Sequence, residues 1–190
     1  MKTYNMAELG AELGLQKGLF LTREKGEQAY QLLRNQFEQI LEGQGLLLTF
    51  PEGQLVDASF ADETIIRLGE ELLNSKSGNV ALILQGLTED SIKNIEAVIS
   101  FRRLKLAFLA VESTGKWECI GQLDPVLKEL LYCLAQRDSL TAPQLASLFK
   151  LAINTASTRL KRLHDRHLIR RQYEVSEKGL QYFYYFWHWA

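Results

Sequence analysis

Residues 146–171 read A-S-L-F-K-L-A-I-N-T-A-S-T-R-L-K-R-L-H-D-R-H-L-I-R-R, which gives two short helical patterns and then a pair of arginines. Apolar positions recur at Ala156, Leu160, Leu163 and His167/Leu168, at steps of three and four residues. This spacing predicts a helix with one buried stripe. The opposite side of that helix carries hydroxyl groups and cations, at Thr155, Thr158, Arg159, Arg162 and Arg166.

The polar side of this helix is ordered along its length. Small hydroxyl and amide groups lie toward its N-terminal end, and the cations lie further along. A helix that enters the major groove of DNA needs this layout. Short polar side chains suit the part of the helix that is close to base edges, and long cationic side chains suit the part from which they reach the phosphates that flank the groove. The stretch therefore predicts a DNA-reading helix.

Length and composition fit a globular chain. The 190 residues are 46% apolar and 24% charged, which allows one large domain or two small ones. There is no run of eighteen apolar residues, so we expect no transmembrane helix, and the start of the chain does not resemble a signal peptide. Cys119 and Cys133 form neither a C-x-x-C pair nor a disulfide framework, so we expect buried free thiols and a cytoplasmic location.

Charge is divided unevenly along the chain. Residues 125–190 contain ten Lys or Arg against five Asp or Glu, whereas residues 1–124 contain twelve against eighteen. All three histidines also lie in the later part. We therefore expect different partners for the two parts, with contact to a polyanion only for the second.

The first part alternates strand and helix patterns. The expected helices are residues 23–42, 58–74 and 88–103, and the expected strands are residues 46–50, 80–84 and 106–111, with a brief strand at 18–22 and an edge strand at 117–120. Alternation of this kind predicts a mainly parallel or mixed sheet covered by helices. The continuous apolar strands agree with this, because both faces of such a sheet are buried.

We place the domain boundary after residue 121, giving an α/β domain over residues 1–121 and a helical domain over residues 122–190. Asp124 is expected to cap, and Pro125 to open, the first helix of the second domain. Thr141 is expected to cap the next helix. A tight hairpin at 168–175 and a last helix starting at Ser176 complete this domain.

The run N-T-A-S-T-R-L-K-R-L-H-D-R-H-L-I-R-R, followed by V-S-E-K-G-L-Q-Y, resembles the winged helix-turn-helix domains of MarR-like and ArsR-like bacterial regulators over residues 123–185. His167 stands where the family usually has glycine, and histidine tolerates the positive φ of that turn. The resemblance implies transcription regulation through contacts with double-stranded DNA by Asn154, Thr155, Ser157, Thr158, Arg159, Arg162, Arg170 and Arg171. The alternative is a winged helix that contacts only protein.

A second resemblance lies in V-D-A-S-F-A-D-E-T at residues 56–64, with L-T-R-E-K-G-E-Q at 21–28 and L-L-T-F at 47–50. These stretches resemble STAS-like domains, which are akin to the anti-sigma-factor antagonists, over residues 5–112. The resemblance implies a phosphorylation or partner site, for a kinase or a sigma-related protein, at Ser59, Asp62 and Glu63. The residues themselves predict a helix cap from Asp57 or Ser59, and we favour a plain cap for Ser59.

Residues 182–189, Y-F-Y-Y-F-W-H-W, are aromatic at seven of eight positions. We expect them to form a helix that is apolar on all sides, which must pack on the first domain, on a second copy of the chain, or on both. A homodimer is the interpretation that we prefer. Stacking of bases on these rings is disfavoured, because no cations accompany them.

The chain contains no motif that predicts catalysis. G-x-x-x-x-G-K-[ST], G-x-G-x-x-G and G-x-S-x-G are all absent, and His164, His167 and His188 lack the spacing of zinc ligands. We therefore expect no enzyme activity, no cofactor and no metal, and we expect His164 and His167 to serve packing. The sequence predicts a DNA-binding regulator with a sensing α/β domain; the alternative is a protein-interaction adaptor resembling an anti-sigma-factor antagonist that does not bind DNA.

Overall fold

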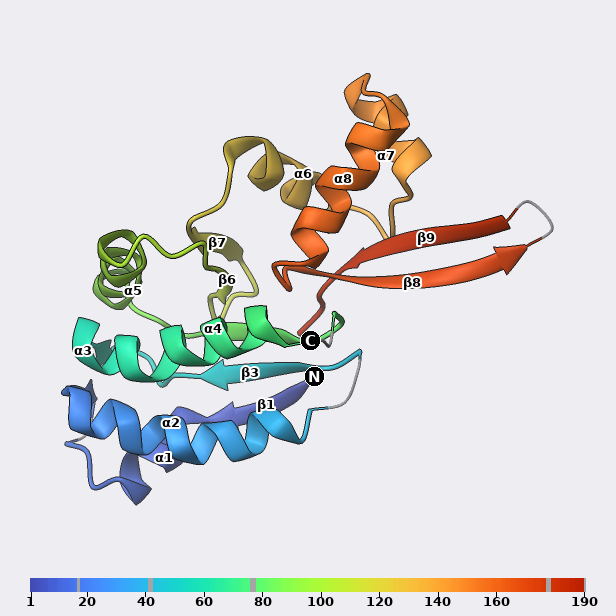
Figure 1. Cartoon of the computed structure of the whole chain (residues 1–190). Helices are drawn as coiled ribbons and strands as arrows, with labels where there is room; N and C mark the ends of the chain where they lie inside the picture. Colours follow the sequence, from blue (N-terminus) through green and yellow to red (C-terminus); the bar gives the residue numbers. More distant parts are fainter. Residues whose placement is uncertain (17, 41–42, 76–77, 177–178, 190) are drawn as a thin grey trace.

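The computed structural model describes residues 1–16, 18–40, 43–75, 78–176 and 179–189, and it has a mixed α/β fold around a five-stranded sheet (Figure 1). In spatial order the strands are β1 Lys2–Asn5, β3 Gly45–Thr49, β5 Ala81–Gln85, β6 Ala107–Val111 and β7 Trp117–Gly121. The first four are parallel, and β7 runs antiparallel to β6. The prediction of a mainly parallel or mixed sheet is confirmed.

The middle strands send alternate side chains to opposite faces of the sheet. Leu46 pairs with Leu82 and faces one side, whereas Leu47 pairs with Ile83 and faces the other. All four are buried. Strands buried on both faces read as continuous apolar runs, which is the pattern that the sequence shows.

The helices of the first part all pack on one face of the sheet. They are α1 Met6–Glu12, α2 Arg23–Glu38, α3 Ala58–Ala61, a π-helical segment Asp62–Ile66, α4 Arg67–Asn74 and α5 Glu89–Phe101. Side-chain caps from Thr22, Asp57 and Thr88 fix where α2, α3 and α5 begin. Helix α2 ends at Glu38 rather than at residue 42, and residues 41–42 lie outside the described residues.

A small second sheet joins β2 Leu19–Phe20 to β4 Leu55–Val56 in parallel. The brief strand that we expected at residues 18–22 is thus present. Strands β1 and β4 were not predicted, because each is too short to show a period in the sequence.

The opposite face of the sheet is covered by the C-terminal part of the chain. Its elements are α6 Pro125–Ala135, α7 Ala142–Phe149, α8 Ile153–His164 and the hairpin of β8 Ile169–Ser176 with β9 Gly179–Phe186. Leu131 and Leu160 share one buried cluster with Ile83 and Leu109 of the sheet. The two parts of the chain therefore share a core, and the C-terminal part buries a sheet face that would otherwise expose apolar side chains.

The predicted boundary falls in the turn between β7 and α6. Gly121 has φ 89°, and a Cβ there would lie 2.6 Å from the Leu106 carbonyl oxygen, so the turn needs glycine. Asp124 then accepts from the N–H of Val126, and Pro125 opens α6, as expected. Thr141 forms a capping box with Gln144 at the start of α7, in agreement with its predicted role.

The prediction of an aromatic C-terminal helix is wrong. Residues 179–186 form strand β9, which pairs along its whole length with β8, so the hairpin is longer than the tight one predicted at 168–175. Tyr184 and Phe186 are buried, whereas Phe183 and Tyr185 are only half-buried, which is the period-two burial of a strand. Aromatic side chains favour strands, and six in succession, at residues 182–187, hid this alternation in the sequence.

The apolar stripe of α8 is also shorter than predicted. The helix ends at His164, so His167 and Leu168 lie beyond it in the turn toward β8. His167 has φ 59°, which confirms that histidine occupies a left-handed position there. Among the residues that the structure describes, no helix has the length and apolar character needed to cross a membrane.

Candidate nucleic-acid interface

Helix α8 is held on the body of the molecule by its apolar stripe. It follows α7 after a tight turn in which Lys150 has left-handed backbone, with φ 52°, and the Leu151 N–H donates to the Ala146 carbonyl at 2.9 Å. Ala156, Leu160 and Leu163 are each 0% exposed. Burial of this stripe turns the opposite side of α8 outward.

The residues predicted to read DNA lie on the outward side of α8. Asn154, Thr155, Ser157, Thr158 and Arg162 are exposed, and Arg159 is half-buried. The Thr158 hydroxyl donates to the Asn154 carbonyl at 2.8 Å, so its oxygen remains as an acceptor. Five of these six side chains are therefore open to a partner from outside.

Helix α8 begins without a capping side chain, since Ala152 precedes it. In the described part of the chain, each other helix that begins after a loop or strand has a side-chain cap, from Asn5, Thr22, Asp57, Thr88, Asp124 or Thr141. Ala152, Ile153 and Asn154 are all exposed. The first N–H groups of α8 and the positive end of its dipole are therefore open to an anion from outside.

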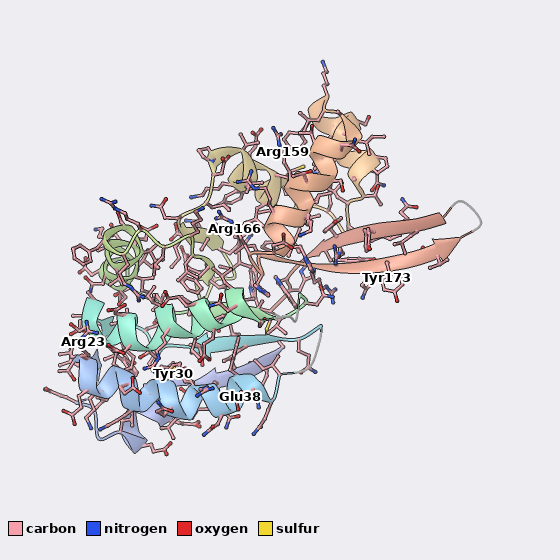
Figure 2. The ribbon with its side chains drawn as sticks, viewed as in Figure 1. Arg23, Tyr30, Glu38, Arg159, Arg166 and Tyr173 are labelled. Atoms are coloured by element: carbon pink, nitrogen blue, oxygen red, sulfur yellow. The ribbon has the colours of Figure 1, made fainter. Side chains whose placement is uncertain are left out.

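Two arginines of α8 and a third just beyond its end continue along one flank of the helix. Arg159, Arg162 and Arg166 are three and four residues apart, and within the described ranges none of them forms an ion pair with a carboxylate. Figure 2 shows Arg159 and Arg166 on the side of α8 toward α6. On the other flank, Lys161 is bound to Asp165 at 2.6 Å. The free positive charge of α8 thus lies along one side.

Arg170 and Arg171 lie at the base of the hairpin rather than near its tip. The guanidinium of Arg170 stacks on Tyr185 at 5.2 Å, and that of Arg171 stacks on Tyr182 at 4.5 Å. Both residues are half-buried. The hairpin projects away from the sheet (Figure 1), and Glu174 is exposed toward its outer end. The two arginines are therefore separated from the tip.

Asn79, just before β5, ties the C-terminal part to the sheet. Its amide Nδ2 donates to the Arg171 carbonyl at 2.8 Å, and its Oδ1 accepts from the Arg171 N–H at 2.7 Å. His164 Nε2 lies 3.2 Å from the same Oδ1, which assigns the proton of this ring to Nε2. His167 Nδ1 lies 2.9 Å from the Val80 carbonyl. The expected packing role of both histidines is confirmed.

Burial keeps His164 neutral at this junction. Burial, together with the neighbouring Arg171 cation, lowers the pKa of His164 to about 4. In the described residues, His164 Nδ1 has no hydrogen-bond partner. A proton on that atom would place a second charge beside Arg171, and Asp165, whose Oδ1 lies 3.8 Å from Nδ1, offsets this only in part, so the junction favours the neutral ring.

Ser59, Asp62 and Glu63 belong to a different region, on the sheet face opposite α8. Asp57, not Ser59, caps α3, with its Oδ1 accepting from the Phe60 N–H at 2.6 Å, so the interpretation of Ser59 as the cap is wrong. Ser59 is half-buried in the first turn of α3. Asp62 pairs with Arg23 and Arg102, and Glu63 pairs with Arg23 and Arg67. The two predicted sets of site residues are not brought together.

Sequence reasoning missed three features of this surface. Ala152 at the start of α8 is visible in the sequence as an apolar residue where a cap is usual. Arg103 and Lys105 lie beside Arg162 and Arg166 in one pocket, which no local pattern reveals. Asn79 gave no signal, because its partners lie 85 and 92 residues further along the chain.

A search of protein-family models finds no match to this chain, and a search of curated proteins finds no significant match either. The assignment of a function therefore depends on the geometry, charge and burial of its own residues.

Proposed function

We propose that this protein is a DNA-binding transcriptional regulator in which α8 reads duplex DNA and the α/β part receives a signal or a regulatory partner such as a kinase or sigma-related protein. The observation that carries the proposal is the outward side of α8. It combines an uncapped N-terminus, four exposed hydroxyl or amide side chains and unpaired arginines on one helix. Folding and packing of the chain do not by themselves require these features to occur together.

The order of elements supports the finer assignment of the C-terminal part. Three helices followed by an antiparallel hairpin are the elements of a winged helix-turn-helix domain, with α8 as the recognition helix. The α/β part, with the S-F-A-D-E stretch at the start of its third helix, is proposed to be STAS-like. We assign the whole chain no enzyme activity and propose that it works in the cytoplasm.

Recognition would divide between the two ends of α8. Asn154 and Thr155, beside the open N–H groups, are short enough to meet base edges, and the Thr158 oxygen adds an acceptor. Arg159 and Arg162 then reach the phosphates on one side of the groove. Arg170 and Arg171, at the base of the hairpin, would contact the backbone on the other side of α8.

We further propose that the protein acts as a homodimer. Because residues 179–186 form strand β9 and not a helix, the proposed contact is made by the hairpin. Tyr173 faces Tyr182 and Val175 faces Leu180 across the two strands, so the four share one face of the hairpin. They are 67%, 38%, 76% and 54% exposed, respectively. Light scattering of Val175→Lys should give a smaller particle than wild type; equal particles would remove this proposal.

The function is tested by binding of the full chain to genomic duplex fragments, by pull-down and then by electrophoretic shift over a salt series. The proposal expects a selected set of fragments whose affinity falls steeply as salt rises, because phosphate contacts release counterions. Stoichiometric co-purification with a kinase or a sigma-related protein, without any shift of DNA, would instead support the adaptor alternative.

A further inference from the structure

A basic pocket lies where the α/β part meets α8. It has a volume of about 570 Å³ and lies between the end of α5, the start of β6, the start of α6 and the end of α8. Four cations line it, Arg103 and Lys105 from the α/β part and Arg162 and Arg166 from the end of α8 and just beyond it. One carboxylate, that of Asp124, also lines it, and its Oδ1 accepts from the Val126 N–H at 2.9 Å.

These four cations have no carboxylate partner among the described residues, whereas most other described cations of the first part of the chain have one. Within the described ranges, Arg23, Arg34, Arg67, Arg102, Lys93 and Lys116 each form an ion pair with a glutamate or an aspartate. Arg103 and Lys105 form none, nor do Arg162 and Arg166. Unpaired cations of both parts of the chain therefore gather in one hollow.

The pocket brings its cations together at a cost. The guanidinium of Arg166 is fixed by donating to the Gln122 carbonyl at 2.7 Å, and burial together with the neighbouring Arg162 lowers the pKa of Arg166. Like charges that line one pocket repel each other unless an anion lies between them, and the Asp124 carboxylate of the lining offsets this only in part for Arg166. The arrangement is thus complementary to a bound anion.

Arg103 adds an independent sign of function. It follows α5 with left-handed backbone, φ 54°, at a position that ends many helices and usually holds glycine. A side chain with a Cβ is strained there by about 1 kcal/mol. Strained residues of this kind gather at functional sites, and this one presents a cation to the pocket.

We infer that this pocket binds phosphates of the DNA backbone, so that the α/β part contacts DNA directly beside α8. This inference rests on the proposed function and extends it. Arg162 and Arg166 continue the flank that begins at Arg159, so a backbone that follows this flank enters the pocket. Arg103 and Lys105 then contact the DNA backbone from the α/β part. A signal received by the α/β part therefore acts directly on a DNA contact.

The test uses the full chain and a fluorescein-labelled duplex selected by pull-down, with anisotropy measured over a sodium chloride series. The variant Arg103→Gly/Lys105→Gln removes both cations of the α/β part. Each lost phosphate contact reduces the slope of log affinity against log salt by about 0.9, so we expect the slope to shrink by about 2 and affinity at low salt to fall roughly tenfold or more. The matched control is Lys93→Gln/Lys116→Gln, which removes the same charge and should leave the slope unchanged.

The same variant separates binding from folding. Glycine relieves the left-handed strain at Arg103, so the thermal midpoint should rise by about 2 °C while DNA binding weakens. Weaker binding cannot then be ascribed to loss of structure.

Three results would overturn the inference. If the pocket variant and its control give equal slopes while Arg159→Ala/Arg162→Ala weakens binding, α8 reads DNA but the pocket does not. If the pocket variant loses binding of inorganic pyrophosphate yet keeps the wild-type DNA slope, the pocket holds a free phosphate compound. If wild type shows no salt-dependent binding of any duplex, the proposed function itself fails.

Discussion

Two surfaces of this molecule hold their arginines in opposite ways. On the surface formed by α2, the π-helical segment, α4 and the end of α5, Arg23, Arg67 and Arg102 each bind carboxylates from a neighbouring element. On the flank of α8 and in the pocket beside it, Arg159 and Arg162 have no such partner among the described residues. Paired charges join helices of one chain, whereas unpaired cations of one sign are suited to a partner from outside. We therefore propose that the first surface serves stability and the second serves binding.

The largest expected effect comes from removing the unpaired arginines of α8. Arg159→Ala/Arg162→Ala removes two charge-assisted contacts, each worth about 1.5 kcal/mol, so DNA affinity should fall by about 100-fold. The free energy of unfolding in urea should change by less than about 0.5 kcal/mol, because neither side chain has an ion-pair partner among the described residues. Equal DNA affinity of the variant and wild type would contradict the assignment of this flank.

A second prediction concerns the junction that holds the binding surface on the sheet. The pKa of His164 is about 4 in the folded chain and near 6.5 when unfolded, so the unfolded state binds the extra proton between these values. The stability from this group is therefore complete above pH 6.5 and is lost as pH falls toward 4, by up to about 3 kcal/mol.

Urea unfolding at neutral and at mildly acidic pH measures this loss. His164→Gln keeps a donor for Asn79 Oδ1 without titrating, so its stability should depend less on pH than that of wild type. If both proteins lose the same stability between the two pH values, His164 does not titrate as described.

The smallest expected effect comes from removing Arg102, which belongs to the surface of paired charges. Arg102 binds Asp62 at 2.6 Å and Glu70 at 2.9 Å across two elements, and its side chain is 35% exposed. Arg102→Ala should lower the free energy of unfolding by about 1 kcal/mol or less, since exposed ion pairs contribute little. DNA affinity should not change, although the variant loses a positive charge next to Arg103. A fall in DNA affinity as large as that of Arg159→Ala/Arg162→Ala would contradict the division of roles between the two surfaces.

Much of the fold could be predicted because the signals are local. Apolar runs such as Leu46–Leu48 mark strands buried on both faces, and caps such as Thr88, Asp124 and Thr141 mark helix starts in the sequence itself. The outward side of α8 was predictable for the same reason. Its buried stripe at Ala156, Leu160 and Leu163 has the helical period, which fixes the side that faces away.

The parts that could not be predicted depend on contacts between distant residues. Residues 182–186 are aromatic at every position, and only pairing with β8 gives them the alternation of a strand. Asp57 caps α3 in preference to Ser59 because it stands one residue before the helix, where its Oδ1 and Oδ2 accept from Phe60 and Thr22. The pocket at Arg103 exists only because α8 packs on the second face of the sheet.

The most direct measurement of the central claim is photocrosslinking from one position on each surface. A photoreactive residue at Thr155, on the outward side of α8, is compared with one at Asn35, which is exposed on α2. With duplex DNA bound, the account predicts a DNA adduct from position 155 and none from position 35. Bound DNA that gives no adduct from position 155, or equal adducts from both, would contradict it.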